Sequence, residues 1–314
     1  MASKYDLTNP RVVRELLDRY GLAPKKGYGQ NFLINRDVPY RIAASAAAGC
    51  DVGYGEAECA SGVSALEIGP GVGSMTSELS DLFDRVCAVE IDAGLIPLLE
   101  EVLSECGNVS VVNADFLKLD LPSFLLEKFG GERVRVCANL PYYVTTPVIM
   151  KILESFPPVE KAPIDSVTVM IQREVADRLC SSESDAEYGS VTASVALHGR
   201  VEKLFSVAPG NFYPAPKVTS AVVQIKLYEN GIYDLYPDAP ADREECVSFI
   251  GKVKRVIELA FIQRRKTLVN ALSGEFSKEK ILAALEAMEK RPDVRGERLS
   301  PYDFCRLTDI LNRK

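Results

Sequence analysis

Histidine and paired cysteines are scarce in this sequence, and their scarcity excludes several kinds of site. His198 is the only histidine, so a conventional histidine-based catalytic triad is excluded. The eight cysteines include no C-x-x-C pair, which excludes zinc sites of the usual spacing. Scattered, unpaired cysteines are typical of a reducing compartment. We therefore expect a cytoplasmic protein without a metal site.

Long hydrophobic runs are also missing. The longest uncharged run, Val136–Met150, is too short to span a bilayer and is interrupted by Asn139, Pro141 and Pro147. Residues 1–19 carry charges throughout and have no apolar core, which argues against a secretory signal. The formal net charge of −7 argues mildly against a protein that coats nucleic acid indiscriminately. We expect no membrane partner.

The chain is long enough for about two domains, because 314 residues exceed the usual size of one. Short apolar runs alternate with helical patterns, which predicts an α/β fold with a parallel sheet covered by helices. These runs occupy residues 64–68, 86–89, 109–112, 134–138 and 166–171. A later, partly exposed strand is expected over 218–227, a linker over 228–241, and helices beyond it. The predicted domains are residues 1–228 and residues 229–314.

A glycine-rich motif, Glu67-Ile68-Gly69-Pro70-Gly71-Val72-Gly73, follows the first of these runs. Glycines at a turn from strand to helix let the backbone approach a ligand closely. The fingerprint of NAD-binding proteins is G-x-G-x-x-G, whereas Ser74 occupies the place of its last glycine here. This spacing favours S-adenosylmethionine (SAM), which has no pyrophosphate. A glycine turn without a ligand is the alternative.

Two acidic residues end the next two apolar runs. Glu90 lies within the spacing expected of an acid that accepts hydrogen bonds from ribose hydroxyls. Asp115 ends the following run, and its carboxylate could accept a hydrogen bond from an adenine amino group. Surface carboxylates without a ligand are the alternative interpretation.

The motif Asn139-Leu140-Pro141-Tyr142 follows the fourth run and favours chemistry on the amine of a nucleobase. Such an amine is a poor nucleophile, because its lone pair is delocalised into the ring. The side-chain carbonyl of Asn139 and a backbone carbonyl beside it, for which Leu140 is the candidate, can accept both amine hydrogens and localise the lone pair. Tyr142 offers a flat face to the base. A plain turn is the alternative.

A second aromatic residue occurs in the loop Asn211–Val218, where two prolines favour an extended chain that presents Phe212. Together with Tyr142, it could sandwich a base that has been drawn out of its stack. The alternative is that the loop buries Phe212 in the core.

Basic residues cluster locally despite the acidic total. Residues 252–280 carry a net charge of +5 and residues 1–41 a net charge of +4. Such patches contact phosphates and position nucleic acid without reading its bases, although a solvated helix face would look the same. The candidate RNA-binding residues are Lys25, Lys26, Lys217, Arg264, Arg265 and Lys266.

Taken together and in this order, the motifs resemble those of the ribosomal RNA adenine N6,N6-dimethyltransferases of the KsgA type. The resemblance covers about residues 25–227, and the combination is far more specific than any single motif. The matching stretches are Gly29–Leu33, Glu67–Gly73, Val89–Asp92, Ala114–Asp115, Asn139–Tyr142, Gln172–Ala176 and Phe212–Ser220.

The resemblance implies a Rossmann-like, SAM-dependent domain followed by a small helical domain. It implies that Asn139 also contacts the target amine, with Tyr142 and Phe212 flanking the base. The implied reaction transfers four methyl groups to two adjacent adenosines near the 3′ end of small-subunit (16S-type) rRNA. The implied partners are this rRNA and the assembling 30S particle, and we expect a monomer. The implied SAM pocket consists of Asn31, Leu33, Gly69, Glu90, Asp115 and Asn139.

This sequence departs from the family pattern in several places. Tyr143 and Thr145 stand where a small polar residue and serine are expected, Thr219 stands where aspartate is frequent, and the loop expected over 51–62 is longer than usual. Three other interpretations stay open: an Erm-type enzyme that modifies large-subunit rRNA, an NAD-dependent oxidoreductase, and a non-catalytic RNA-binding assembly factor.

Overall fold

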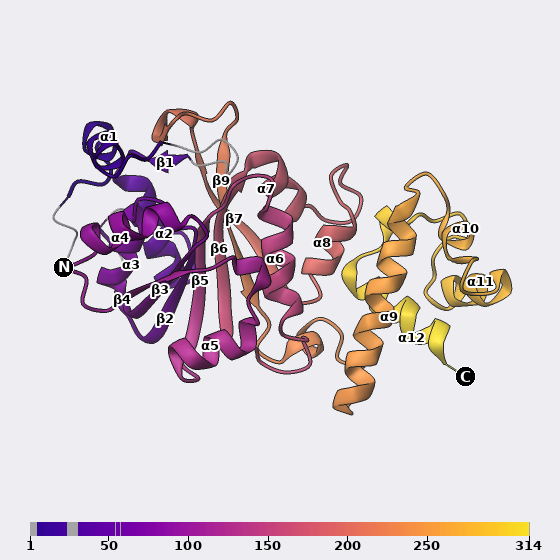
Figure 1. The fold of residues 1–314 in the computed structure, drawn as a ribbon. Helices are drawn as coiled ribbons and strands as arrows, with labels where there is room; N and C mark the ends of the chain where they lie inside the picture. Colours follow the sequence, from indigo (N-terminus) through magenta and orange to yellow (C-terminus); the bar gives the residue numbers. More distant parts are fainter. Residues whose placement is uncertain (1–4, 24–30, 54, 57, 314) are drawn as a thin grey trace. The chain divides into compact units, whose positions relative to one another are not determined.

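The computed structural model describes residues 5–23, 31–53, 55–56 and 58–313 (Figure 1). Lys25 and Lys26 therefore lie outside the described residues. The chain divides into two compact units. The sheet unit takes in residues 1–156, 163–176 and 202–226, and the helical unit takes in residues 157–162, 177–201 and 227–314. The last crossing is close to the expected boundary at 228, but two earlier segments that we expected in the first domain belong to the helical unit.

A seven-stranded sheet forms the centre of the sheet unit, in the order β4-β3-β2-β5-β6-β9-β7. The first five strands in this order, β4, β3, β2, β5 and β6, are parallel to one another, and β9 is antiparallel to β6. The predicted α/β class is confirmed, and all five predicted runs are strands. The strands are β2 (Ala60–Ile68), β3 (Phe83–Glu90), β4 (Val109–Asn113), β5 (Arg133–Asn139), β6 (Ile164–Gln172), β7 (Gly199–Val207) and β9 (Ser220–Leu227).

Three details of the sheet differ from the sequence-based expectation. Strand β2 begins at Ala60, inside the predicted loop, because its first residues pair with Phe83 of β3. Strand β9 is buried from Ser220 to Ile225, since it lies between β6 and β7 rather than at an edge. Strand β7 was not predicted. It lies at one edge of the sheet and carries exposed charged residues, which hide the usual apolar signal.

Helices pack against the sheet in two apolar cores, one of which includes the amino-terminal helix α1. Asn9 caps the first helix by accepting a hydrogen bond from the Arg11 N–H at 2.9 Å. Helices α2 and α3 pack on the sheet in one apolar core, and α1 and α4 share a second core with Phe32 and Val72. The helices are α1 (Pro10–Arg19), α2 (Asp37–Ala48), α3 (Ser74–Leu82), α4 (Ile96–Val102), α5 (Leu121–Phe129) and α6 (Thr145–Glu154).

A separate two-stranded sheet joins distant parts of the sheet unit. Strands β1 (Phe32–Leu33) and β8 (Phe212–Tyr213) are antiparallel, with Leu33 opposite Phe212. The pairing continues beyond β1, because the Ile34 N–H donates to the Asn211 carbonyl at 2.9 Å. The Asn35 side-chain amide donates to the side-chain oxygen of Asn211 at 2.7 Å. The segment after α1 is therefore tied to the loop that precedes β9.

The helical unit has its own apolar core, built mainly from α9 and the helices around it. Ile232 and Tyr236 are buried in this core, so the predicted linker over 228–241 is wrong. Prolines, glycine and acidic residues around these two side chains masked their apolar character. No helix among the described residues is long and apolar enough to span a membrane. The division between the two units falls within α7 (Arg173–Leu179). The helices of the helical unit are α8 (Ser190–Val195), α9 (Arg243–Ile262), α10 (Leu268–Leu272), α11 (Lys278–Ala287) and α12 (Pro301–Asn312).

Candidate functional site

A cavity of about 300 Å³ opens in the sheet unit where β2, β3 and β5 end. The carboxyl ends of parallel strands meet along one edge of a sheet, which is where such folds bind ligands. Short segments from β1 and β8 complete the lining. The structure brings together every predicted catalytic and SAM-binding residue here: Asn31, Leu33, Gly69, Glu90, Asp115, Asn139, Leu140, Tyr142 and Phe212.

The glycine loop after β2 forms one wall of the cavity. Gly69 and Gly71 have φ angles of +72° and +61°, which side chains rarely tolerate. A Cβ atom at Gly71 would lie 3.2 Å from the ring of Phe32, a tight contact that the ring would have to relieve by shifting. A Cβ atom at Gly69 would meet nothing within 4 Å. A ligand can therefore approach the backbone at Gly69.

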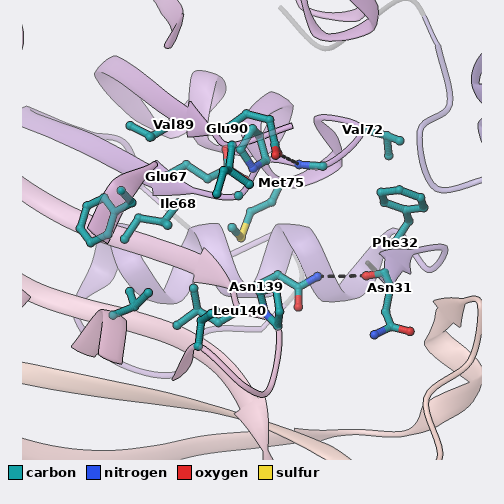
Figure 2. Close-up of a pocket in the computed structure, with 18 of the residues that line it drawn as sticks. Asn31, Phe32, Glu67, Ile68, Val72, Met75, Val89, Glu90, Asn139 and Leu140 are labelled. Carbon is teal, nitrogen blue, oxygen red and sulfur yellow. Dashed lines mark hydrogen bonds between the residues drawn. The ribbon is translucent and has the colours of Figure 1, made fainter. Parts of the chain in front are cut away.

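Glu90 ends β3 as a buried carboxylate held by backbone donors. Its Oε1 accepts the Asp92 N–H at 2.8 Å. Its Oε2 accepts the Gly71 N–H at 3.3 Å (Figure 2). Burial raises the pKa of the Glu90 carboxyl, and these backbone hydrogen bonds offset part of the rise. The carboxylate is thus pinned between the strand end and the glycine loop, where it can accept further hydrogen bonds from hydroxyls.

Glu67 lies one strand away, and its environment is very different. Its side chain is only 1% exposed, and neither oxygen has a partner in hydrogen-bonding geometry among the described residues. Burial raises the pKa of Glu67 to about 8, which the Thr76 hydroxyl offsets in part. Glu67 belongs to the glycine-rich sequence motif, but no role was predicted for it. A carboxylate inside an otherwise apolar strand was the available signal.

Asp115 lines the cavity just after β4. Its Oδ1 accepts the Leu117 N–H at 3.1 Å and caps the short 3-10 helix Phe116–Lys118. Its other oxygen pairs with the exposed Lys118 side chain at 3.3 Å. Because an ionised carboxylate can accept about four hydrogen bonds, these contacts fix its position and still leave acceptor capacity.

Asn139 ends β5, the central strand of the sheet. Its Nδ2 donates to the backbone carbonyl of Asn31 at 3.2 Å (Figure 2). A primary amide carries its oxygen on the opposite arm, so this hydrogen bond sets the direction of Oδ1. The next residue is anchored too, because the Leu140 N–H donates to the Met170 carbonyl of β6 at 3.3 Å. The contact between Asn139 and Asn31 spans 108 residues and has no local sequence signal.

A tight turn follows Leu140 and carries two tyrosines. The Val144 N–H donates to the Pro141 carbonyl at 3.1 Å and closes the turn. The Tyr142 hydroxyl lies 3.1 Å from the Ser220 hydroxyl of β9, and its ring is half-buried. Phe212 is 4% exposed and packs in the core, yet it also lines the cavity. The alternative that the loop buries Phe212 in the core is confirmed, and contact of its ring with a base stays a prediction.

The candidate RNA-binding residues are distributed over both units. Lys217 is exposed in the sheet unit, whereas Arg265 and Lys266 are exposed in the helical unit just after α9. Arg264 is held within its own unit: its guanidinium donates to the carbonyls of Ala186 and Tyr188, both at 2.9 Å.

Comparisons with known proteins agree with this arrangement. The sequence pattern described as "Ribosomal RNA adenine dimethylase" matches residues 21–313. A protein of Alkaliphilus oremlandii named "Ribosomal RNA small subunit methyltransferase A" is 39% identical, covering 98% of this chain and 99% of its own. A protein of the same name from Lachnoclostridium phytofermentans is also 39% identical, covering 98% of each chain.

Two solved structures share the fold. The 23S rRNA methyltransferase ErmE is 25% identical with a TM-score of 0.65, and the match covers 90% of this chain and 100% of that one. A dimethyladenosine transferase from Plasmodium falciparum is 24% identical with a TM-score of 0.66, covering 88% of this chain and 95% of that one. The fold is thus the Rossmann-like fold of rRNA methyltransferases, and the chain belongs to the ribosomal RNA adenine dimethylase family of SAM-dependent methyltransferases.

Proposed function

We propose that this protein transfers methyl groups from SAM to the N6 amines of two adjacent adenosines near the 3′ end of small-subunit (16S) rRNA. The observation that carries the proposal is the position of Asn139, which is held by Asn31 in the same cavity as the pinned Glu90 carboxylate. The names of the full-length relatives support a small-subunit substrate.

The residues around the cavity fit SAM. The Glu90 carboxylate can accept hydrogen bonds from ribose hydroxyls, and the open space at Gly69 admits a ligand close to the backbone. The unpartnered Glu67 carboxylate suits a cationic ligand, because an opposite charge would stabilise its ionised form. We propose that Asn31, Leu33 and Asp115 complete this pocket. When bound, SAM supplies an electrophilic methyl group.

The catalytic contribution of the chain itself is to orient the amine. Asn139 Oδ1 and the Leu140 carbonyl accept the two amine hydrogens, which localises the nitrogen lone pair. No strong general base is needed, since the amine proton becomes acidic as the nitrogen gains a methyl group, and no metal ion takes part. Tyr142 and Phe212 flank the base and keep water away from it.

We assign phosphate contacts to exposed basic residues of both units. Lys217, Arg265 and Lys266 are exposed. The hydrogen bonds of Arg264 orient the segment that carries its neighbours Arg265 and Lys266. We also assign phosphate contacts to Lys25 and Lys26, which belong to an RNA-contacting arm at the amino terminus. Residues 229–314 form the second RNA-binding part of the chain in this proposal. We further propose that the protein is a cytoplasmic monomer that acts on the assembling 30S particle.

Membership of the dimethylase family sets aside the NAD-dependent oxidoreductase. Modification of large-subunit rRNA is a second candidate function, because ErmE shares the fold over nearly the whole chain. The deciding experiment maps N6,N6-dimethyladenosine on both rRNAs from cells with and without this protein. We expect two adjacent dimethyladenosines of small-subunit rRNA to disappear without it. Loss from the large-subunit rRNA would favour the second candidate, and no loss at all would favour a non-catalytic factor.

A further inference from the structure

Three large apolar side chains at the cavity are exposed rather than packed. Ile91, Leu117 and Tyr143 all line the cavity, with exposed fractions of 49%, 38% and 61%. Ile91 follows Glu90 in the sequence, and Leu117 lies in the short helix capped by Asp115. Tyr143 instead follows Tyr142, beside the residues that would hold the target base. Packing does not account for so exposed an aromatic ring on the rim of a binding cavity.

The backbone that carries Tyr143 is fixed on both sides. Tyr142 and Tyr143 are the two central residues of the turn closed by Pro141 and Val144. The helix α6 begins directly afterwards, at Thr145, whose hydroxyl donates to the Pro141 carbonyl at 3.4 Å. A tyrosine has only two rotatable side-chain torsions, so a fixed backbone presents its ring at a low cost in conformational entropy.

The two neighbouring tyrosines have different surroundings. Tyr142 is half-buried and its hydroxyl contacts Ser220 at 3.1 Å, as expected of a residue that forms part of the cavity wall. The Cα atom of Tyr143 lies about 3.8 Å from that of Tyr142. The side chain of Tyr143 is mostly exposed to solvent. This is also the position where the sequence has an aromatic residue in place of the expected small polar one.

We propose that Tyr143 forms a second nucleobase subsite at the rim of the cavity, where its ring stacks on the nucleotide adjacent to the target adenosine. This inference rests on the proposed function. When one base is drawn out of the stack, its neighbour loses a stacking partner, and an exposed aromatic ring can replace that partner. Stacking on an aromatic ring tolerates any base. The subsite therefore makes no demand on the identity of the neighbouring base, whichever adenosine of the pair occupies the cavity.

The test compares Tyr143→Ala, Tyr143→Phe and Tyr143→Trp in the full-length protein. The substrate is unmethylated small subunits isolated from cells that lack this protein. We expect Tyr143→Ala to lower kcat/KM about tenfold, mostly by raising KM, which corresponds to about 1.4 kcal/mol and lies within the range for stacking on one base. The phenylalanine and tryptophan variants should stay close to wild type, and SAM affinity should not change.

Leu126→Ala is the matched control, because Leu126 is an exposed apolar residue of α5 that does not line the cavity. Its activity should equal that of wild type. Wild-type kinetics for Tyr143→Ala would overturn the inference, and so would a phenylalanine variant as impaired as the alanine variant. Wild-type protein that binds SAM but leaves the subunits unmethylated would overturn the proposed function itself, and this inference with it.

Discussion

The two walls of the cavity are held in place by different kinds of contact. The glycine-loop wall consists of Glu67–Gly73 and Glu90, which lie at the ends of the adjacent strands β2 and β3. These residues are close in sequence, and the hydrogen bond from Gly71 to Glu90 spans 19 residues. The asparagine wall consists of Asn31–Leu33, Asn139–Tyr143 and Phe212. Its bond from Asn139 to Asn31 spans 108 residues.

Under the proposed function, this difference separates the binding of SAM from the orientation of the amine. The glycine-loop wall presents the Glu90 carboxyl group to a ligand, and it rests on adjacent parallel strands and on the Phe32 ring. The asparagine wall aims an amide and two aromatic rings, and it depends on the pairing of β1 with β8. We therefore expect changes in the first wall to alter the affinity for SAM and changes in the second to alter the rate of methyl transfer.

The largest effect is expected for Asn139→Ala in the asparagine wall. Loss of the oriented carbonyl should lower kcat at least about a hundredfold, as removal of a single electrostatic donor or acceptor does in other active sites. The measurement is single-turnover methylation of unmethylated small subunits, with circular dichroism to verify the fold. SAM affinity should fall far less than the rate. Near-normal turnover would refute the assigned role of Asn139.

Glu90→Ala should have the next largest effect, and it should act on binding. Hydrogen bonds to a charged group contribute about 1.5–3 kcal/mol, so the Kd for SAM should rise about tenfold to a hundredfold. RNA binding should be unaffected. Calorimetric titration with SAM tests this, with the exposed Glu100 of α4 replaced by alanine as control. Unchanged SAM affinity in Glu90→Ala would contradict the proposed contact with the ribose.

Glu67 should give the glycine-loop wall a distinctive pH dependence. Its pKa is raised from 4.5 to about 8 in the folded protein, so the folded state holds one more proton than the unfolded chain between these values. The free energy of unfolding should therefore fall as pH rises through this window, by about 1.4 kcal/mol per pH unit.

Glu67→Gln removes this contribution, and the variant should become progressively more stable than wild type between about pH 5 and pH 8. Denaturant unfolding at several pH values measures the difference. The matched control is Glu100→Gln on the surface of α4, which makes the same chemical change at an exposed position. Parallel pH profiles of wild type and Glu67→Gln would show that Glu67 is ionised in the folded protein.

The smallest effect is expected where the two-stranded sheet meets solvent. The exposed hydrogen bond between Asn35 and Asn211 should contribute about 0.5–1.5 kcal/mol to stability. Asn35→Ala should slow methyl transfer severalfold without changing the Kd for SAM, because this bond supports the asparagine wall. A double-mutant cycle with Asn211→Ala tests the coupling. Additive effects of the two substitutions would show that the pair does not act as a unit.

The same difference between the walls decides how much the sequence could predict. Glu90 and the glycines of the loop were predicted from local motifs at strand ends. Asn139 was also predicted from its motif, but the carbonyl that holds its amide comes from Asn31, which only the tertiary fold reveals. The unusual state of Glu67 likewise depends on burial that no spacing shows.

Local composition also misled the prediction of some elements. Strand β7 was missed because Arg200, Glu202 and Lys203 suit an edge strand but not the usual apolar signature. The segment 228–241 looked like a linker, since its prolines and acidic residues outweighed Ile232 and Tyr236. In both cases the tertiary context overrides local sequence character: strand pairing at the sheet edge for β7, and burial for Ile232 and Tyr236.

The pairing of β1 with β8 has a consequence for how the protein matures during synthesis. The ribosome makes the chain from its amino terminus, so the five parallel strands emerge before Phe212 and Tyr213 do. A nascent chain that ends ahead of these residues can assemble the glycine-loop wall but has no partner for Phe32 and Leu33. Under the proposed function, catalytic competence therefore arrives late in translation, when the loop preceding β9 pairs with the segment that follows α1.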